Sequence, residues 1–250
     1  MDAAKSMIEA ASDAGADGVK FQYYAFTDIA DELTNATDLL RHQVFKAQLD
    51  LAQLQELRDL TAKFGLAFII TPFKTARKVA EVTALKPDAI KIRYTDGPSN
   101  HSDHVGLCNV ALATEVSLVM ASCTVPPIEI FSLNYNPRMR WLYCIPKYPP
   151  ALEDFEPARS TGLNGFSDHY PHATAAIIAA SLTRFADYII EKHVMLDGPV
   201  DGEKPPDANV SITFNQLAEL AQHLRRMEKL KPSEKLWFPP PPRGPSIAKR

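Results

Sequence analysis

Two segments carry the side chains best suited to chemistry, residues 165–169 (GFSDH) and residues 188–193 (YIIEKH). Both have the apolar start of a buried strand, and side chains alternate between faces along a strand. Glu191 and His193 are therefore expected on one face, with His169 in the equivalent place on the preceding strand. Two imidazoles at adjacent strand ends favour a divalent-metal site with positions open to substrate. Two unrelated structural histidines are the alternative on spacing alone.

Other polar side chains follow apolar runs in the same way, as if placed where further strands end. They are Lys20, Gln22, Thr71, Lys91, Ser122, Lys147 and Ser167. The carboxyl ends of the strands are where a (β/α)8 barrel gathers its active site. An open doubly wound sheet would also bind there, across a single crevice. The chain has no glycine-rich phosphate loop of the GxGxxG or Walker type, which disfavours a nucleotide-binding sheet.

The elements that must position these residues alternate strictly between strand and helix, which is typical of a parallel sheet. The apolar patterns predict strands over residues 18–22, 66–70, 88–92, 117–122, 140–145, 164–169 and 188–193. Helices are predicted over residues 2–14, 38–64, 75–85, 105–113, 128–134, 154–161, 173–182 and 214–224. The fold class is therefore α/β, a (β/α)8 TIM barrel with its first strand missing or supplied irregularly.

The length, net charge and composition of the chain predict a globular protein of the cytoplasm. A length of 250 residues is enough for a sizeable core, and a net charge of −3 argues against nucleic acid as the main partner. No apolar run approaches the ~20 residues that cross a bilayer, and the N-terminal residues lack a signal-peptide pattern. Three cysteines without CxxC spacing, Cys108, Cys123 and Cys144, are expected to be buried free thiols.

Six short motifs occur in an order that is specific enough to suggest a family. They are Gly15–Gln22, Thr71–Phe73, Lys91–Ile92, Tyr148–Asp154, Gly165–His169 and Ile190–His193. Together they resemble the sialic acid synthase family, the N-acetylneuraminate synthases and their legionaminate and pseudaminate relatives. The resemblance covers residues 1–233, interpreted as one TIM-barrel domain, and leaves residues 234–250 as a proline-rich tail.

The resemblance implies an enzyme that condenses phosphoenolpyruvate with an N-acyl amino sugar, N-acetylmannosamine or a related 2,4-diacetamido sugar. The products would be a nine-carbon 2-keto acid and phosphate, and a divalent metal, Mn²⁺ or Mg²⁺, would be required. His169 and His193 match the family's metal ligands, and Glu191, Tyr148 and Lys91 match catalytic positions. The positions expected to bind substrate are Lys20, Gln22, Thr71, Lys91, Asp96 and Ser167. The resemblance also implies a possible homodimer and gives no role to nucleic acid or membrane.

The chain departs from the family pattern at several places. Tyr94 stands where the family has a serine that contacts phosphoenolpyruvate, and Asp96 stands where a glutamate is usual. Pro146 replaces an asparagine, and Ala208 replaces a histidine. The family's first strand and its small C-terminal antifreeze-like domain have no counterpart among the motifs of this sequence.

Three functions therefore remain open. A divergent synthase is the first. The second is a barrel without catalysis, which would bind sugar or phosphoenolpyruvate or associate with a full-length synthase. Another two-histidine metal barrel, such as an isomerase or aldolase, is the third. Arg93 is left between two interpretations, an inward anion contact and an outward surface arginine.

Overall fold

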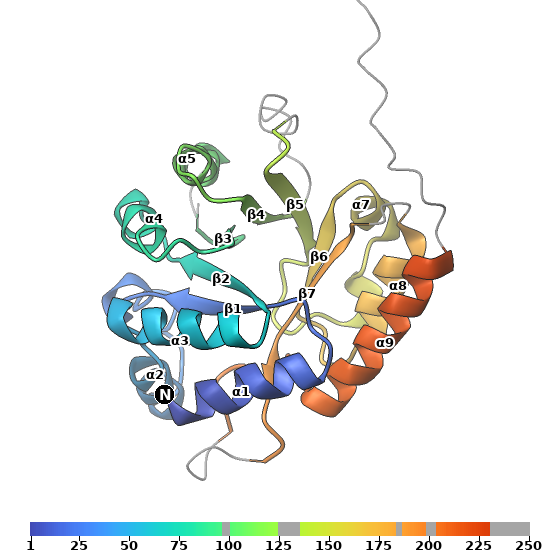
Figure 1. Cartoon of the computed structure of the whole chain (residues 1–250), viewed down its shortest axis with the longest axis horizontal. Helices are drawn as coiled ribbons and strands as arrows, with labels where there is room; N and C mark the ends of the chain where they lie inside the picture. The colour runs from blue at the N-terminus through green and yellow to red at the C-terminus, as the bar shows by residue number, and fades with distance from the viewer. Residues whose placement is uncertain (97–100, 125–135, 184–186, 199–203, 231–250) are drawn as a thin grey trace, which may run out of the picture.

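Seven parallel strands form one curled sheet whose spatial order is the order of the chain, β1 to β7. The computed structural model describes residues 1–96, 101–124, 136–183, 187–198 and 204–230 (Figure 1). The strands are β1 (Gly18–Tyr23), β2 (Ala67–Pro72), β3 (Ala89–Ile92), β4 (Leu118–Cys123), β5 (Met139–Cys144), β6 (Gly165–Asp168) and β7 (Ile189–Lys192). Each predicted strand is thus confirmed within a few residues, and the curled sheet is that of a (β/α)8 TIM-barrel-like fold with one strand missing.

Helices cover the outer face of the curled sheet, as Figure 1 shows. They are α1 (Asp2–Asp13), α2 (Asp38–Lys46), α3 (Leu51–Lys63), α4 (Ala76–Thr83), α5 (His101–Leu112), α7 (Pro157–Thr161), α8 (Thr174–Leu182) and α9 (Phe214–Leu230). Short 3-10 turns, η1 (Phe26–Asp28) and η3 (Leu152–Asp154), lie in the loops after β1 and β5. Among the described residues, no helix has both the length and the apolar character needed to span a bilayer.

Two features of the fold differ from the sequence predictions. The single helix expected over residues 38–64 is wrong, because α2 ends at Lys46 and α3 begins at Leu51. Asp50 caps α3, since its side chain accepts from the Gln53 backbone at 2.7 Å while the Gln53 side chain accepts from the Asp50 backbone at 2.9 Å. A parallel pair, β8 (Val194–Met195) and β9 (Ile212–Thr213), was not predicted. The predicted helix over 128–134 and the tail over 234–250 lie outside the described residues.

The two faces of the sheet bury different side chains. The face toward the helices packs into the main apolar core, which includes Ile70, Ile90 and Phe166. The opposite face, inside the curl, begins with an apolar layer made of Ile69, Ala89, Leu118, Met120, Leu142 and Ile189. Two residues farther along the strands, the same face carries polar groups. The free cysteines Cys108, Cys123 and Cys144 are buried, as expected. The interior is therefore closed at the amino ends of the strands and polar at the carboxyl ends, where barrel enzymes hold their active sites.

A buried ion pair on the helix-facing side fixes the orientation of β6 and β7. The Lys192 ammonium lies 3.1 Å from the Asp168 carboxylate, with side-chain exposures of 2% and 0%. Lys192 also donates to the Tyr170 carbonyl oxygen. Burial raises the pKa of Asp168 against the attraction of Lys192. The alternation predicted for both strands is confirmed here, because Asp168 and Lys192 face away from Ser167 and Glu191.

Removing one member of this pair is expected to lower stability strongly. Asp168→Asn leaves a buried ammonium without its counter-charge, so the free energy of unfolding should fall by about 3–5 kcal/mol in urea titrations. The exposed pair of Arg58 and Asp59 supplies the control. Asp59→Asn should change the free energy of unfolding by less than about 1 kcal/mol. Adding Lys192→Met to Asp168→Asn should recover most of the loss. Equal effects of the two single substitutions would contradict this account of the pair.

Candidate active site

One carboxylate, Glu191 on β7, gathers three side chains at the polar end of the interior. The ammonium groups of Lys20 and Lys91 each lie 2.9 Å from Glu191 Oε1. The Ser167 hydroxyl donates to the same oxygen at 3.0 Å and lies 3.5 Å from the Lys91 ammonium. These residues come from β1, β3, β6 and β7, so only the curl of the sheet brings them together. The prediction that polar side chains gather where the strands end is confirmed for these four residues.

Burial and charge set the protonation of this cluster. Burial alone would raise the pKa of Glu191, but the attraction of Lys20 and Lys91 holds that pKa well below its ordinary value. Burial lowers the pKa of Lys91, whose side chain is 2% exposed, and Glu191 opposes this shift. The cluster therefore presents two ammonium groups beside a single carboxylate, which together carry a net charge of +1. A preplaced pair of cations with a hydroxyl donor is suited to a polyanionic substrate.

Three further residues predicted to bind substrate occupy different environments. Gln22 and Thr71 are direct neighbours in the register of β1 and β2. Thr71 is fully buried, and among the described residues its hydroxyl has no hydrogen-bond partner. A buried hydroxyl without a hydrogen-bond partner lowers the stability of the fold, and a hydrogen bond to a bound ligand would remove that cost. Asp96 is buried too, but it binds Arg93 and is not among the contacts of the Glu191 cluster.

The two predicted metal ligands lie next to each other. The rings of His169 and His193 have centroids 5.3 Å apart, at the carboxyl ends of β6 and β7. Burial, followed by the neighbouring His193, lowers the pKa of His169 to about 3. Burial also lowers the pKa of His193. Neutral imidazole is the form that binds a metal ion, so this pair fits a divalent ion with open positions. Within the described residues, no group of three or more His, Cys, Asp or Glu side chains is arranged to hold one.

Tyr148 and Asp207 complete this side of the site. The Tyr148 ring lies 4.9 Å from the His169 ring and 6.3 Å from the His193 ring, centroid to centroid. Its hydroxyl donates to Asp207, whose carboxylate also lies 3.5 Å from His193 Nδ1. Asp207 therefore orients both a predicted catalytic residue and a predicted metal ligand. It was missed from the sequence because it lies in a loop beyond the last strand of the main sheet.

Comparisons with known proteins identify the family of the chain. Residues 7–235 match the NeuB family. The chain is 26% identical to the pseudaminic acid synthase of Campylobacter jejuni, over 91% of this chain and 70% of that protein. It is 25% identical to an N,N'-diacetyllegionaminic acid synthase of the same organism, over 92% of this chain and 72% of that protein.

A solved structure supports the fold. The N-acetylneuraminic acid (sialic acid) synthetase of Leptospira borgpetersenii, solved in complex with citrate, superimposes with a TM-score of 0.73. The two chains are 23% identical, and the match covers 95% of this chain and 82% of that one. The family match spans every strand of the described residues and both clusters of polar side chains. The chain therefore belongs to the NeuB family, the family of the sialic acid synthases.

Proposed function

We propose that this chain condenses phosphoenolpyruvate with an open-chain N-acyl amino sugar, N-acetylmannosamine or a related 2,4-diacetamido sugar. The product is a nine-carbon 2-keto acid of the sialic acid type, and phosphate is released. The observation that carries the proposal is the cluster of Lys20, Lys91 and Ser167 around Glu191 at the polar end of the curled sheet. The chain's relatives, named as synthases of such sugar acids, support the same chemistry.

The lysines hold the phosphorylated enol acid. Lys20 and Lys91 bind its anionic groups as compact point charges, and Ser167 and Thr71 supply hydroxyl donors. Fixed positive groups also stabilise the negative charge that moves onto the departing phosphate, and they need no reorganisation during the reaction. Before substrate binds, Glu191 keeps both ammonium groups in place.

The condensation proceeds by carbon–carbon bond formation followed by loss of phosphate. The C3 carbon of phosphoenolpyruvate forms a bond to the aldehyde carbon of the sugar, and the aldehyde oxygen takes up a proton. The positive centre left at C2 is captured by water, which gives up one proton. The bond from C2 to the phosphate oxygen then breaks, the remaining hydroxyl proton passes to the departing phosphate, and the ketone forms. Glu191 is placed to accept the proton of that water or to hold a sugar hydroxyl.

His169 and His193 would hold the divalent metal, Mn²⁺ or Mg²⁺, in their neutral forms. When bound there, the ion supplies Lewis-acid polarisation of the sugar's carbonyl oxygen. Tyr148 and Asp207 fix the orientation of the two imidazoles from the other side.

Phosphate release tests the proposal. The purified chain is incubated with Mn²⁺, phosphoenolpyruvate and a panel of N-acyl amino sugars that contains N-acetylmannosamine and 2,4-diacetamido sugars. Sugar-dependent release of phosphate, with a nine-carbon keto acid detected by mass spectrometry, is the expected result. Absence of turnover with every sugar of the panel would remove the catalytic claim.

A barrel that binds these substrates without turning them over is the second candidate. It is favoured by the open sheet, since within the described residues β1 pairs only with β2 and β7 pairs only with β6. Tyr94, at the position where the resemblance gives the family a serine, is 41% exposed. Normal turnover by the chain alone would exclude this candidate. Turnover only after a full-length synthase is added would favour it.

A further inference from the structure

A buried thiol, that of Cys144, lies against one of the two proposed metal ligands. Cys144 is the last residue of β5 and is 3% exposed. The register pairs it with Ser167, which pairs in turn with Glu191, so the three residues form one row across β5, β6 and β7. Residues paired across neighbouring strands share a face of the sheet. Cys144 therefore faces the polar interior that holds the Glu191 cluster.

The thiol contacts the ring of His169 at one particular nitrogen. His169 follows Ser167 by two residues and so continues the same face beyond the end of β6. Its Nδ1 atom lies 3.8 Å from Cys144 Sγ. A neutral imidazole has one protonated nitrogen, which donates, and one bare nitrogen, which accepts. Either the thiol donates to a bare Nδ1, or a protonated Nδ1 donates to the sulfur. Only the second arrangement leaves Nε2 with the lone pair that a metal ion needs.

The single proton of the thiol has another acceptor. Cys144 Sγ donates to the Ile145 carbonyl oxygen at 3.8 Å. Because a thiol has only one proton, sulfur whose proton is directed at that carbonyl offers His169 nothing but lone pairs. Nδ1 of His169 is then the donor of the contact with sulfur, and Nε2 is the bare nitrogen.

The ring of His193 has the same arrangement with a different partner. Its Nδ1 atom lies 3.5 Å from the Asp207 carboxylate. An ionised carboxylate can only accept, so this Nδ1 carries the proton and Nε2 is bare. Metal-binding histidines usually donate from their other nitrogen to a carboxylate, a carbonyl oxygen or water. The rings of His169 and His193 thus leave the same nitrogen open, although one has a carboxylate partner and the other a thiol.

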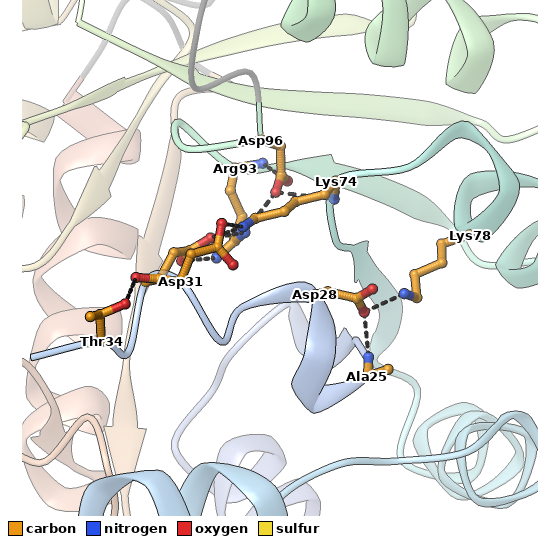
Figure 2. Close-up of polar contacts among 9 residues, drawn as sticks. Ala25, Asp28, Asp31, Thr34, Lys74, Lys78, Arg93 and Asp96 are labelled. Carbon is orange, nitrogen blue, oxygen red and sulfur yellow. Dashed lines mark hydrogen bonds and ion pairs between the residues drawn. The ribbon is translucent and has the colours of Figure 1, made fainter. Parts of the chain in front are cut away.

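Carboxylates of the neighbouring loops are bound to cations instead. Figure 2 shows two of them, Asp28 against Lys78 and Asp96 against Arg93. Within the described part of the chain, neither carboxylate is in contact with His169. The sulfur on β5 therefore takes the place that a carboxylate has beside the other ring.

We propose that Cys144 is a positioning residue of the metal site, whose sulfur accepts a hydrogen bond from Nδ1 of His169 and so keeps Nε2 of that ring open to the divalent ion. This inference rests on the proposed function, which supplies the ion. A thiol also suits this position by its charge. Ser167, its neighbour in the register, lies 3.5 Å from the Lys91 ammonium. A carboxylate in place of Cys144 would add a second negative charge near the lysines, whereas a thiol is ordinarily neutral at pH 7 and leaves them to the enol acid.

Nitrogen NMR of the metal-free chain tests the tautomer directly. Long-range ¹H–¹⁵N spectra distinguish protonated from bare ring nitrogens, and the signals lost in His169→Ala assign that ring among the seven histidines. In the unsubstituted chain, Nδ1 of His169 should be protonated and Nε2 bare. Cys144→Ala should populate the opposite tautomer, because a buried N–H without an acceptor is disfavoured. Cys144→Ser, whose hydroxyl can still accept, should restore the first tautomer.

Manganese affinity, measured by electron paramagnetic resonance, tests the positioning role. Cys144→Ala should weaken Mn²⁺ binding by about tenfold, as loss of an outer partner does at other metal sites, and Cys144→Ser should recover most of that loss. Cys123→Ala is the matched control. Cys123 is a buried thiol on the adjacent strand, but it belongs to the apolar core on the helix side. Cys123→Ala removes the same atom from the interior and should change neither the tautomer nor the affinity.

Each outcome decides the inference. A protonated Nε2 on His169 of the unsubstituted chain would overturn it, and so would equal Mn²⁺ affinities of Cys144→Ala and Cys123→Ala. A protonated Nδ1, together with a loss of affinity confined to Cys144→Ala, would support it. None of these measurements needs catalysis. A chain with the expected tautomers and affinities that never releases phosphate would count against the proposed function alone, whereas phosphate release with equal affinities would count against Cys144 alone.

Discussion

Replacing Lys91 with methionine is expected to lower kcat/KM for phosphoenolpyruvate by about a thousandfold, or about 4 kcal/mol of transition-state stabilisation. Lys91 is the most deeply buried cation of the cluster, and its ammonium contacts both Glu191 and Ser167. Methionine has nearly the same length and fills the same space, so the loss reports the charge. Steady-state phosphate release at several phosphoenolpyruvate concentrations measures the effect.

Lys63→Met is the matched control, because Lys63 lies at the exposed end of α3. It should leave kcat/KM within about twofold of the unsubstituted chain, as surface substitutions generally change little. Circular dichroism of the Lys91 variant should show an unchanged helix signal. A Lys91 variant that is folded and as active as the Lys63 variant would exclude Lys91 from catalysis.

Loss of either histidine is expected to weaken manganese binding by at least about a hundredfold, since a ligand itself should matter at least as much as its outer partners. His169→Ala and His193→Ala each leave one imidazole where the proposed site has two. Titration of free Mn²⁺ by electron paramagnetic resonance measures the affinity without any need for turnover.

His223→Ala serves as the control for that titration, because His223 is exposed on α9. The affinity of the His223→Ala variant for Mn²⁺ should equal that of the unsubstituted chain. Unchanged affinity in either His169→Ala or His193→Ala would refute the paired-ligand assignment.

The parts of the fold that follow from side-chain alternation could be predicted from the sequence. Glu191 and Lys192 are adjacent in the chain, yet one belongs to the polar interior and the other to a buried ion pair on the helix side. The strict period of two along a strand makes this separation certain once the strand is recognised. The same rule placed Ser167 and His169 together.

Features that depend on loops could not be predicted in this way. The apolar spacing continues through residues 47–50, and it hides both the end of α2 at Lys46 and the Asp50 cap that begins α3. Arg93 was left between two orientations, and the structure gives it a third environment, against Phe73 and between Asp96 and Glu32. That environment depends on Glu32, in a loop 61 residues earlier in the chain, and no local sequence pattern shows which loop will contact Arg93.

The most direct test of the account is a calorimetric titration of the chain with phosphoenolpyruvate in the presence of Mn²⁺. We expect one phosphoenolpyruvate site per chain, with its affinity reduced by about a hundredfold, or about 2.7 kcal/mol, in Lys20→Met and unchanged in Lys63→Met. Lys20 lies on β1 and Glu191 on β7, the two edge strands of the curled sheet. Lys20→Met therefore tests whether the curl of the sheet forms the binding site. Absence of phosphoenolpyruvate binding, or equal binding to the Lys20 variant, would contradict the central claim.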